Sequence, residues 1–196
     1  REIVNMTTAT GIKYLSVTET AKLVRQALAK TFPGIKFATR SKSYAGGASI
    51  NVSWTDGPRA KRVDRIIKGF EGRSFDGMND LASDQDSWLL PNGSAALAYR
   101  PDSCGGSIPE YVSDAPHPNA ELVSFGSDYV FSSRAISAYE NKFNAAVALI
   151  SSRCKLESVS GAYQFGNRWL DDLARNTVYD QDDNEFKIID GRSCNR

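Results

Sequence analysis

One segment, Gly47-Ala48-Ser49-Ile50-Asn51-Val52-Ser53-Trp54-Thr55-Asp56-Gly57-Pro58, constrains the fold more than any other part of the chain. Apolar Ile50, Val52 and Trp54 alternate with polar residues, which predicts a half-buried strand that stops on a turn. Pro58 fits the first position of a following helix, where its missing N–H is not needed. The basic run Arg59–Lys68 then predicts an amphipathic helix. The segment contains no recognisable catalytic group.

The chain before this segment predicts a helix and a further strand. Ser16-Val17-Thr18-Glu19 is a capping box, and the apolar residues that follow recur at helical spacing until Phe32-Pro33-Gly34 ends the run. Ile35–Thr39 alternates as a strand, and Ser41–Gly47 is expected to be a flexible link. The order helix-strand-strand-helix predicts an α+β fold with helices packed on one face of a mainly antiparallel sheet.

Turn signals dominate the region after Gly72, at Asp76-Gly77, Pro91–Gly93, Cys104–Gly106 and Ala115–Asn119. Ala95–Tyr99 and Leu122–Ser132 are expected strands, the second interrupted at Gly126. A second capping box, Ser137–Glu140, predicts a helix with apolar residues from Tyr139 to Ile150 on one face. Tyr163–Leu173 predicts a short helix or strand. The expected organisation is an N-terminal extension or expression remnant (1–13), one α+β domain (14–175) and an acidic segment (176–196).

Charge is balanced over the chain but not along it. There are 24 Lys and Arg residues against 23 Asp and Glu, a net charge of +1. Nine basic residues against three acidic ones lie between Lys36 and Arg73, whereas seven acidic against two basic lie between Asp171 and Asp190. Three widely spaced cysteines and the absence of a long apolar run argue against a disulfide scaffold or a membrane span, so a cytoplasmic protein is expected.

Catalytic and metal-binding patterns are weak. The single histidine, His117, lies between two prolines and is interpreted as an exposed loop residue. Cys104, Cys154 and Cys194 lack zinc-site spacing, and the Asp180–Asn184 run lacks the glycine and bidentate glutamate of a calcium loop. Four carboxylates between Asp76 and Asp86 suit a hard cation or, equally, turn formation. The sequence therefore predicts no cofactor and no catalytic residue.

Two features suggest binding. The Tyr44–Ser49 segment is glycine-rich, but because it leads into a strand, a hairpin connection is favoured over a phosphate-binding loop. The basic helix and the strand residues before it offer cations to phosphates, and an ordinary solvated helix face is the alternative for the helix. The candidate partner- or nucleic-acid-binding residues are Arg40, Lys42, Tyr44, Arg59, Lys61, Arg62, Arg65 and Lys68.

Several blocks of the chain, in order, resemble the large polyvalent protein-associated domains, most closely type twenty-nine. The blocks are Tyr14–Arg25, Phe32–Phe37, Ser43–Ile50, Trp54–Pro58 and Phe75–Met78. The resemblance covers roughly Tyr14 to Asp80 and continues more weakly to Ile136. It implies a phage or mobile-element origin, a bacterial cytosol and a role in blunting host defences, and it brings no reaction and no catalytic residues.

Two functional hypotheses follow. The first is a non-enzymatic inhibitor of a bacterial defence nucleoprotein complex, anti-CRISPR-like, that acts through one charged face, with the acidic segment imitating phosphates. The alternative is a nucleic-acid-binding accessory domain in which Arg40, Lys42 and the helix Arg59–Lys68 contact phosphates. An enzyme of unfamiliar type ranks third.

Overall fold

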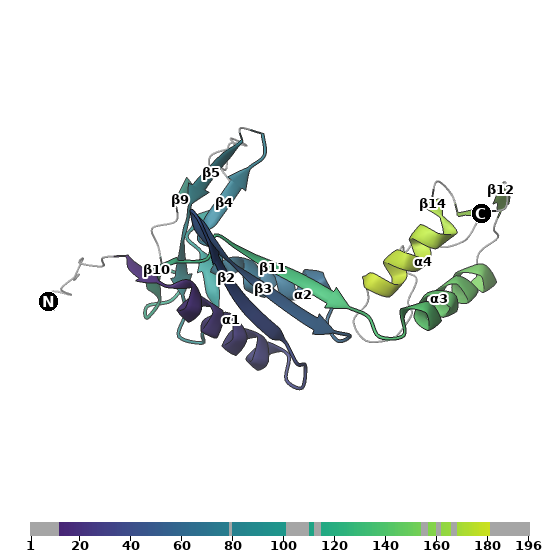
Figure 1. Ribbon diagram of the computed structural model, residues 1–196, viewed down its shortest axis with the longest axis horizontal. Coiled ribbons are helices and arrows are strands. Elements are labelled where there is room, and N and C mark those ends of the chain that lie inside the picture. Colours follow the sequence, from purple (N-terminus) through teal and green to yellow (C-terminus); the bar gives the residue numbers. More distant parts are fainter. Residues whose placement is uncertain are drawn as a thin grey trace, which may run out of the picture. The chain divides into compact units, whose positions relative to one another are not determined.

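The polypeptide is organised as two compact units of an α+β fold. The first comprises Arg1–Pro33, Phe37–Val52 and Arg65–Phe131, and the second Gly34–Lys36, Ser53–Asp64 and Ser132–Arg196. The computed structural model describes residues 12–78, 80–100, 110–111, 115–153, 157–159, 162–165 and 168–180. The predicted fold class is confirmed (Figure 1). The three cysteines, residues 1–11 and most of the predicted acidic segment lie outside the described residues, and the predicted domain boundaries stay predictions.

The first helix, α1 (Val17–Thr31), begins as the sequence predicts. The Ser16 backbone N–H donates to Glu19 Oε2 at 2.9 Å, and the Glu19 N–H donates to Ser16 Oγ at 3.4 Å, so both halves of the capping box are present. Val24 and Leu28 are fully buried. A short strand, β1 (Lys13–Leu15), precedes the helix. It was not predicted, because three residues are too few to show a periodicity.

A three-stranded sheet in the order β11-β3-β2 contains the first nine residues, Gly47–Thr55, of the Gly47–Pro58 segment. β3 (Gly47–Thr55) is the predicted strand, and Ile50 and Val52 on it are fully buried. The prediction for its neighbour was wrong: β2 spans Ala38–Tyr44, later than Ile35–Thr39, and includes most of the expected link. β2 is an edge strand with mostly exposed polar side chains, so no apolar alternation marks it. β11 spans Tyr129–Ala135.

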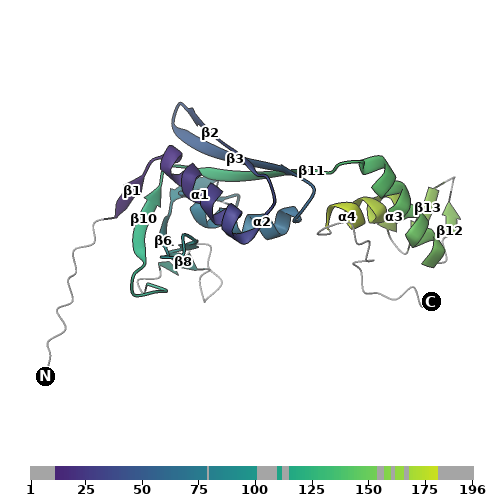
Figure 2. The ribbon, with the colours of Figure 1, turned by 90° about the horizontal axis from the view of Figure 1, so that it is seen from below.

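Helix α2 (Ala60–Ile67) and the 3₁₀ turn η1 (Lys68–Phe70) follow β3. Val63, Ile67 and Phe70 are fully buried, as the predicted apolar stripe requires. Pro58 was placed wrongly, because the helix begins two residues later. It belongs instead to the turn after β3, where its carbonyl accepts a 2.9 Å hydrogen bond from Trp54 Nε1. Within the described residues of the first unit, Figure 2 shows α1 and the end of α2 on one side of the β11-β3-β2 sheet and no helix on the other.

A second, mixed sheet has the order β1-β10-β6-β7. β10 (Glu121–Phe125) pairs in parallel with β1 and antiparallel with β6 (Asp86–Leu89), which pairs antiparallel with β7 (Ala95–Leu97). β10 and β11 lie either side of Gly126, where the sequence predicted an interruption. The predicted turns at Asp76-Gly77 and Pro91–Gly93 are also found. They connect β4 (Arg73–Asp76) to β5 (Leu81–Asp84), and β6 to β7.

The smaller strand pairs complete the described elements. β8 (Tyr99–Arg100) pairs antiparallel with β9 (Glu110–Tyr111). In the second unit β12 (Glu157–Val159), β13 (Ala162–Phe165) and β14 (Arg168–Trp169) form a three-stranded antiparallel sheet. Its helices are α3 (Tyr139–Arg153) and α4 (Leu170–Tyr179). Their core contains Ala146, Ile150, Leu170, Leu173, Ala174 and Val178.

The predicted helix α3 is present, but the capping box at its start is not. Ala138, immediately before the helix, has a positive φ of 47°, and the Ser137 hydroxyl bonds to the Asp56 carboxylate instead of an amide of the helix. The Ser137 N–H also donates to Asp56 Oδ1 at 3.1 Å, and Lys142 Nζ reaches the same oxygen at 2.6 Å. Asp56, a distant residue, therefore satisfies Ser137 in place of the predicted local partner.

Candidate functional site

The face of the β11-β3-β2 sheet that the helices leave open is the candidate site, and it is called the outer sheet face below. Alternating side chains of a strand point to opposite faces. Val52 and Val130 are fully buried beneath the helices, whereas their neighbours Asn51 and Phe131 are exposed. Figure 2 shows the open side of these strands. The outer sheet face is therefore accessible to a ligand within the first unit.

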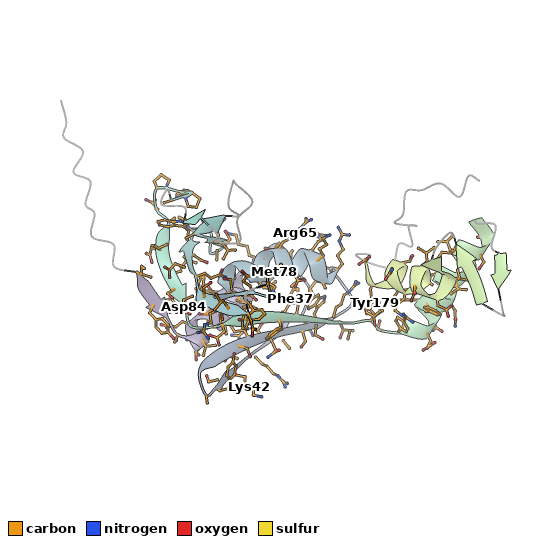
Figure 3. The ribbon with its side chains drawn as sticks, turned by 90° about the horizontal axis from the view of Figure 1, so that it is seen from above. Phe37, Lys42, Arg65, Met78, Asp84 and Tyr179 are labelled. Atoms are coloured by element: carbon orange, nitrogen blue, oxygen red, sulfur yellow. The ribbon has the colours of Figure 1, made fainter. Side chains whose placement is uncertain are left out.

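β2 contributes three predicted site residues to this face. Arg40, Lys42 and Tyr44 are spaced two apart along the strand and are all exposed. The hydroxyl of Thr39, in the alternate set, is buried. Figure 3 shows Lys42 projecting away from the sheet on the side opposite to Arg65. The structure thus brings Arg40, Lys42 and Tyr44 together as one row.

Tyr44 is held in place at the end of that row. Its hydroxyl donates to Asp128 Oδ2 at 2.9 Å, and this hydrogen bond raises the pKa of the Tyr44 phenol above its usual value. The contact passes over Gly47, where an added Cβ would collide with the Asp128 carboxylate and the Tyr44 ring. Gly47 is therefore required for this close approach, and the glycine-rich segment is a hairpin turn, as predicted, at Ala45-Gly46.

Two aromatic residues of β11 join the outer sheet face, and the sequence analysis did not identify them. Phe131 is 50% exposed, and its ring lies 6.2 Å from that of half-buried Tyr129, measured between centroids. The consecutive apolar residues Tyr129, Val130 and Phe131 were a usable signal, because a strand with one solvated face should alternate. Such a run indicates that the outer face also carries apolar side chains.

Arg65, the basic residue of α2 that belongs to the first unit, does not extend this row. Lys61, Arg62 and Arg65 on α2 and Lys68 on η1 are exposed, and Figure 3 shows Arg65 on the far side of the sheet from Lys42. Lys68 has a structural contact: its Nζ lies 2.6 Å from Glu71 Oε1, and that oxygen also accepts the Val130 N–H at 2.8 Å. Arg65 and Lys42 consequently do not lie on one surface of the first unit.

Arg59 also has a structural position, within the second unit. Its Nη1 donates to the carbonyl oxygen of Asp180 at 3.3 Å, just after helix α4. Arg134 donates to the Tyr179 carbonyl at 3.1 Å and to the Gly57 carbonyl at 2.9 Å. Cations at a helix C-terminus stabilise the exposed carbonyl groups there. Arg59 therefore lies at the C-terminal end of α4, and its predicted role in ligand binding stays a prediction.

A groove of about 470 Å³ lies in the first unit at the β2–β3 hairpin end. Arg73 Nε bonds to Asp84 Oδ1 at 3.0 Å, and Asp84 and Asp128 together raise the pKa of Arg73. Gly72 and Gly126 lie so close to neighbouring backbone that a Cβ added at either position would collide with a carbonyl oxygen. The groove is lined by Tyr14, Ser16, Val17, Ser43, Gly47, Ala48, Gly72, Arg73, Asp84, Ser124, Phe125, Gly126 and Asp128.

Residues considered for catalysis or metal binding have other partners. His117 is exposed in a turn, as interpreted from the sequence, and its Nδ1 accepts the Asn119 N–H at 3.0 Å. Asp76 accepts the Met78 N–H at 2.9 Å, which is the turn-forming role weighed for it. Among the described residues, no group of three or more His, Cys, Asp or Glu side chains is arranged to hold a metal ion. Asp182–Asn184 lie outside those residues.

Comparisons with known proteins identify the family. In the described part of the chain, no helix has the length and apolar character needed to cross a membrane. No curated protein and no solved structure matches the chain. The profile of large polyvalent protein associated domain 29 matches residues 15–137, more than half of the sequence, and such domains are typical of phage and mobile-element polyvalent proteins. The chain therefore belongs to the large polyvalent protein associated domain 29 family.

Proposed function

We propose that this chain is a non-enzymatic binding module of a phage or mobile-element protein, and that it binds nucleic acid through the outer sheet face. The observation that carries the proposal is the open sheet face itself, on which Arg40, Lys42, Tyr44 and Phe131 are exposed together. Lys and Arg side chains bind phosphates and release counterions, which supplies affinity. Aromatic rings beside them offer stacking surfaces for bases.

The sheet face is favoured over the α2 surface because its cations are accompanied by aromatic rings. The exposed basic residues here are Lys61, Arg62 and Arg65 of α2 and Lys68 of η1, of which Lys68 is paired with Glu71. An exposed basic helix face is common on soluble domains and does not by itself indicate a ligand. The two surfaces have comparable cations, so they can be compared directly by mutation.

The test is binding of labelled DNA and RNA to two charge-matched double variants at low and moderate salt. Arg40→Glu with Lys42→Glu changes the outer sheet face, and Lys61→Glu with Arg65→Glu applies the same change of charge to α2. We expect the first pair to abolish binding and the second to weaken it far less. Wild-type affinity should fall steeply with salt, since each phosphate contact releases counterions. Equal losses in both pairs, or no binding by the wild type, would contradict the proposal.

Inhibition of a bacterial defence nucleoprotein complex is the second candidate, and the family supports it. Domains of this family are typical of phage and mobile-element polyvalent proteins. A cytosolic host complex would then be the partner, engaged by steric and electrostatic occlusion. The test is the plating efficiency of phage on strains that carry a CRISPR or restriction system and express this chain. Unchanged plating across those strains would count against the inhibitor hypothesis.

A further inference from the structure

We infer that the ligand of the outer sheet face is a single strand of nucleic acid whose bases stack on Phe131 and the rings beside it. This inference rests on the proposed function and specifies its substrate class. It names Phe131 and Tyr129, on β11, as binding residues in addition to the cations of β2. The following observations separate a single strand from a duplex.

The first observation is the exposure of Phe131. Its side chain is 50% exposed, whereas the side chain of Val130, the preceding residue on β11, is fully buried. Phenylalanine has no polar group to hydrate, so an exposed ring on a sheet gains from being covered by another flat apolar surface. The centroid of the Tyr129 ring lies 6.2 Å from that of Phe131, with an interplanar angle of 43°, so the two rings are neighbours. A nucleic-acid base is such a surface, and stacking does not depend on which base it is.

The second observation is the arrangement of rings and cations across the sheet. The strand order β11-β3-β2 puts the Phe131 ring and the Lys42 ammonium on the two flanking strands. Neighbouring strands are about 4.8 Å apart, so these two rows are separated by about 10 Å. A single strand can direct its bases to one row and its phosphates to the other. Asp128, at the Tyr44 end of the face, repels phosphates and favours that orientation.

The third observation is the shape of the surface. The major groove of DNA fits a helix or a two-stranded ribbon, and the flat face of a three-stranded sheet is broader than either. The bases of a duplex are already stacked and paired, so a flat face would reach its phosphates alone. Tyr44 is already fixed by its hydrogen bond to Asp128, so its half-exposed ring can be covered at little further entropic cost. These features favour unpaired bases.

The experiment measures fluorescence anisotropy of the full chain with five labelled probes of equal length, about 12 nucleotides, a length within the range of single-strand binding sites. The probes are oligothymidylate, oligouridylate, mixed-sequence duplex DNA, duplex RNA and an abasic oligonucleotide that keeps the phosphates without bases. The variants are Phe131→Ala, Phe131→Tyr and Lys42→Ala. Phe75→Ala is the matched control, because Phe75 on β4 is 56% exposed and outside this face.

We expect one or both single strands to bind more tightly than the duplexes and the abasic probe, and the two single-strand arms distinguish DNA from RNA. Phe131→Ala should weaken single-strand binding by about 5- to 150-fold and leave the salt dependence unchanged, whereas Phe131→Tyr and Phe75→Ala should bind normally. Lys42→Ala should instead reduce the slope of log affinity against log salt by about 0.7, the value for one phosphate of a single strand.

Two other outcomes are distinguishable. If duplex and abasic probes bind as well as single strands, and Phe131→Ala is neutral while Lys42→Ala weakens binding, the stacking inference is wrong and the proposed function stands. If no probe binds even at low salt, both are wrong. Equal melting temperatures for Phe131→Ala and wild type establish that a loss of binding does not reflect unfolding.

Discussion

Asp56 connects the end of β3 to the start of α3 through hydrogen bonds that the sequence does not reveal. It follows β3 with a positive φ of 56°, a conformation that Asp and Asn adopt more readily than other residues with a side chain. Its carboxylate accepts hydrogen bonds from Lys142 at 2.6 Å and from Ser137. These bonds, that from Lys142 first, lower the pKa of Asp56 from its ordinary value to about 2. The carboxylate therefore stabilises the second unit.

This stabilisation should depend on pH. Because the pKa of Asp56 is lower in the folded protein than in the unfolded chain, its contribution is complete above about pH 4 and is lost as the pH falls towards 2. Its side chain is 37% exposed, so solvent screening reduces the contribution to about 1 kcal/mol. Asp56→Asn should be less stable than wild type by that amount at pH 7, and the difference should shrink as the pH falls towards 2, by urea denaturation. A difference that does not vary with pH would contradict the assignment.

At the scale of elements, the sequence predicts best what local interactions decide. The Ser16–Glu19 capping box and the buried alternation of Ile50 and Val52 are both found. β2 was misplaced because its exposed polar residues have no period, and an edge strand is held by backbone pairing with a distant segment. The exposed position of Phe131 on the outer sheet face was not predicted for a related reason. Which face of a sheet the helices cover is decided by tertiary packing, not by the strand's own residues.

The same distinction predicts how two substitutions, one at Trp54 on β3 and one at Lys61 on α2, should differ. Trp54 is 3% exposed and donates to the Pro58 carbonyl, so Trp54→Asp buries a charge and leaves that carbonyl unpaired. We expect it to cost more than about 4 kcal/mol and to prevent folding. Lys61→Glu, on an exposed helix position, should change stability by less than about 0.5 kcal/mol. Circular dichroism and urea denaturation of both variants provide the check.

At the scale of the whole molecule, two compact units imply two cores that can lose stability separately. Leu173 is 3% exposed in the α3–α4 core of the second unit. Leu173→Ala leaves a cavity there and should lower the free energy of unfolding by about 2 to 5 kcal/mol. Hydrogen exchange read by mass spectrometry should then show faster exchange in α3 and α4 and unchanged protection in α1 and β10 of the first unit, because locally cooperative segments open independently.

The two-unit organisation also predicts which core substitutions should affect nucleic-acid binding. All the residues assigned to the outer sheet face, from Arg40 to Phe131, belong to the first unit. The Leu173→Ala variant should therefore bind oligothymidylate with wild-type affinity, even at temperatures where its second unit has lost exchange protection. Val24→Ala, which removes a fully buried side chain of α1, is the matched control and should weaken binding together with exchange protection of the first unit. Uniformly faster exchange throughout the chain in Leu173→Ala would instead mean that the two units unfold as one cooperative structure, since β3 and β11 are shared by both.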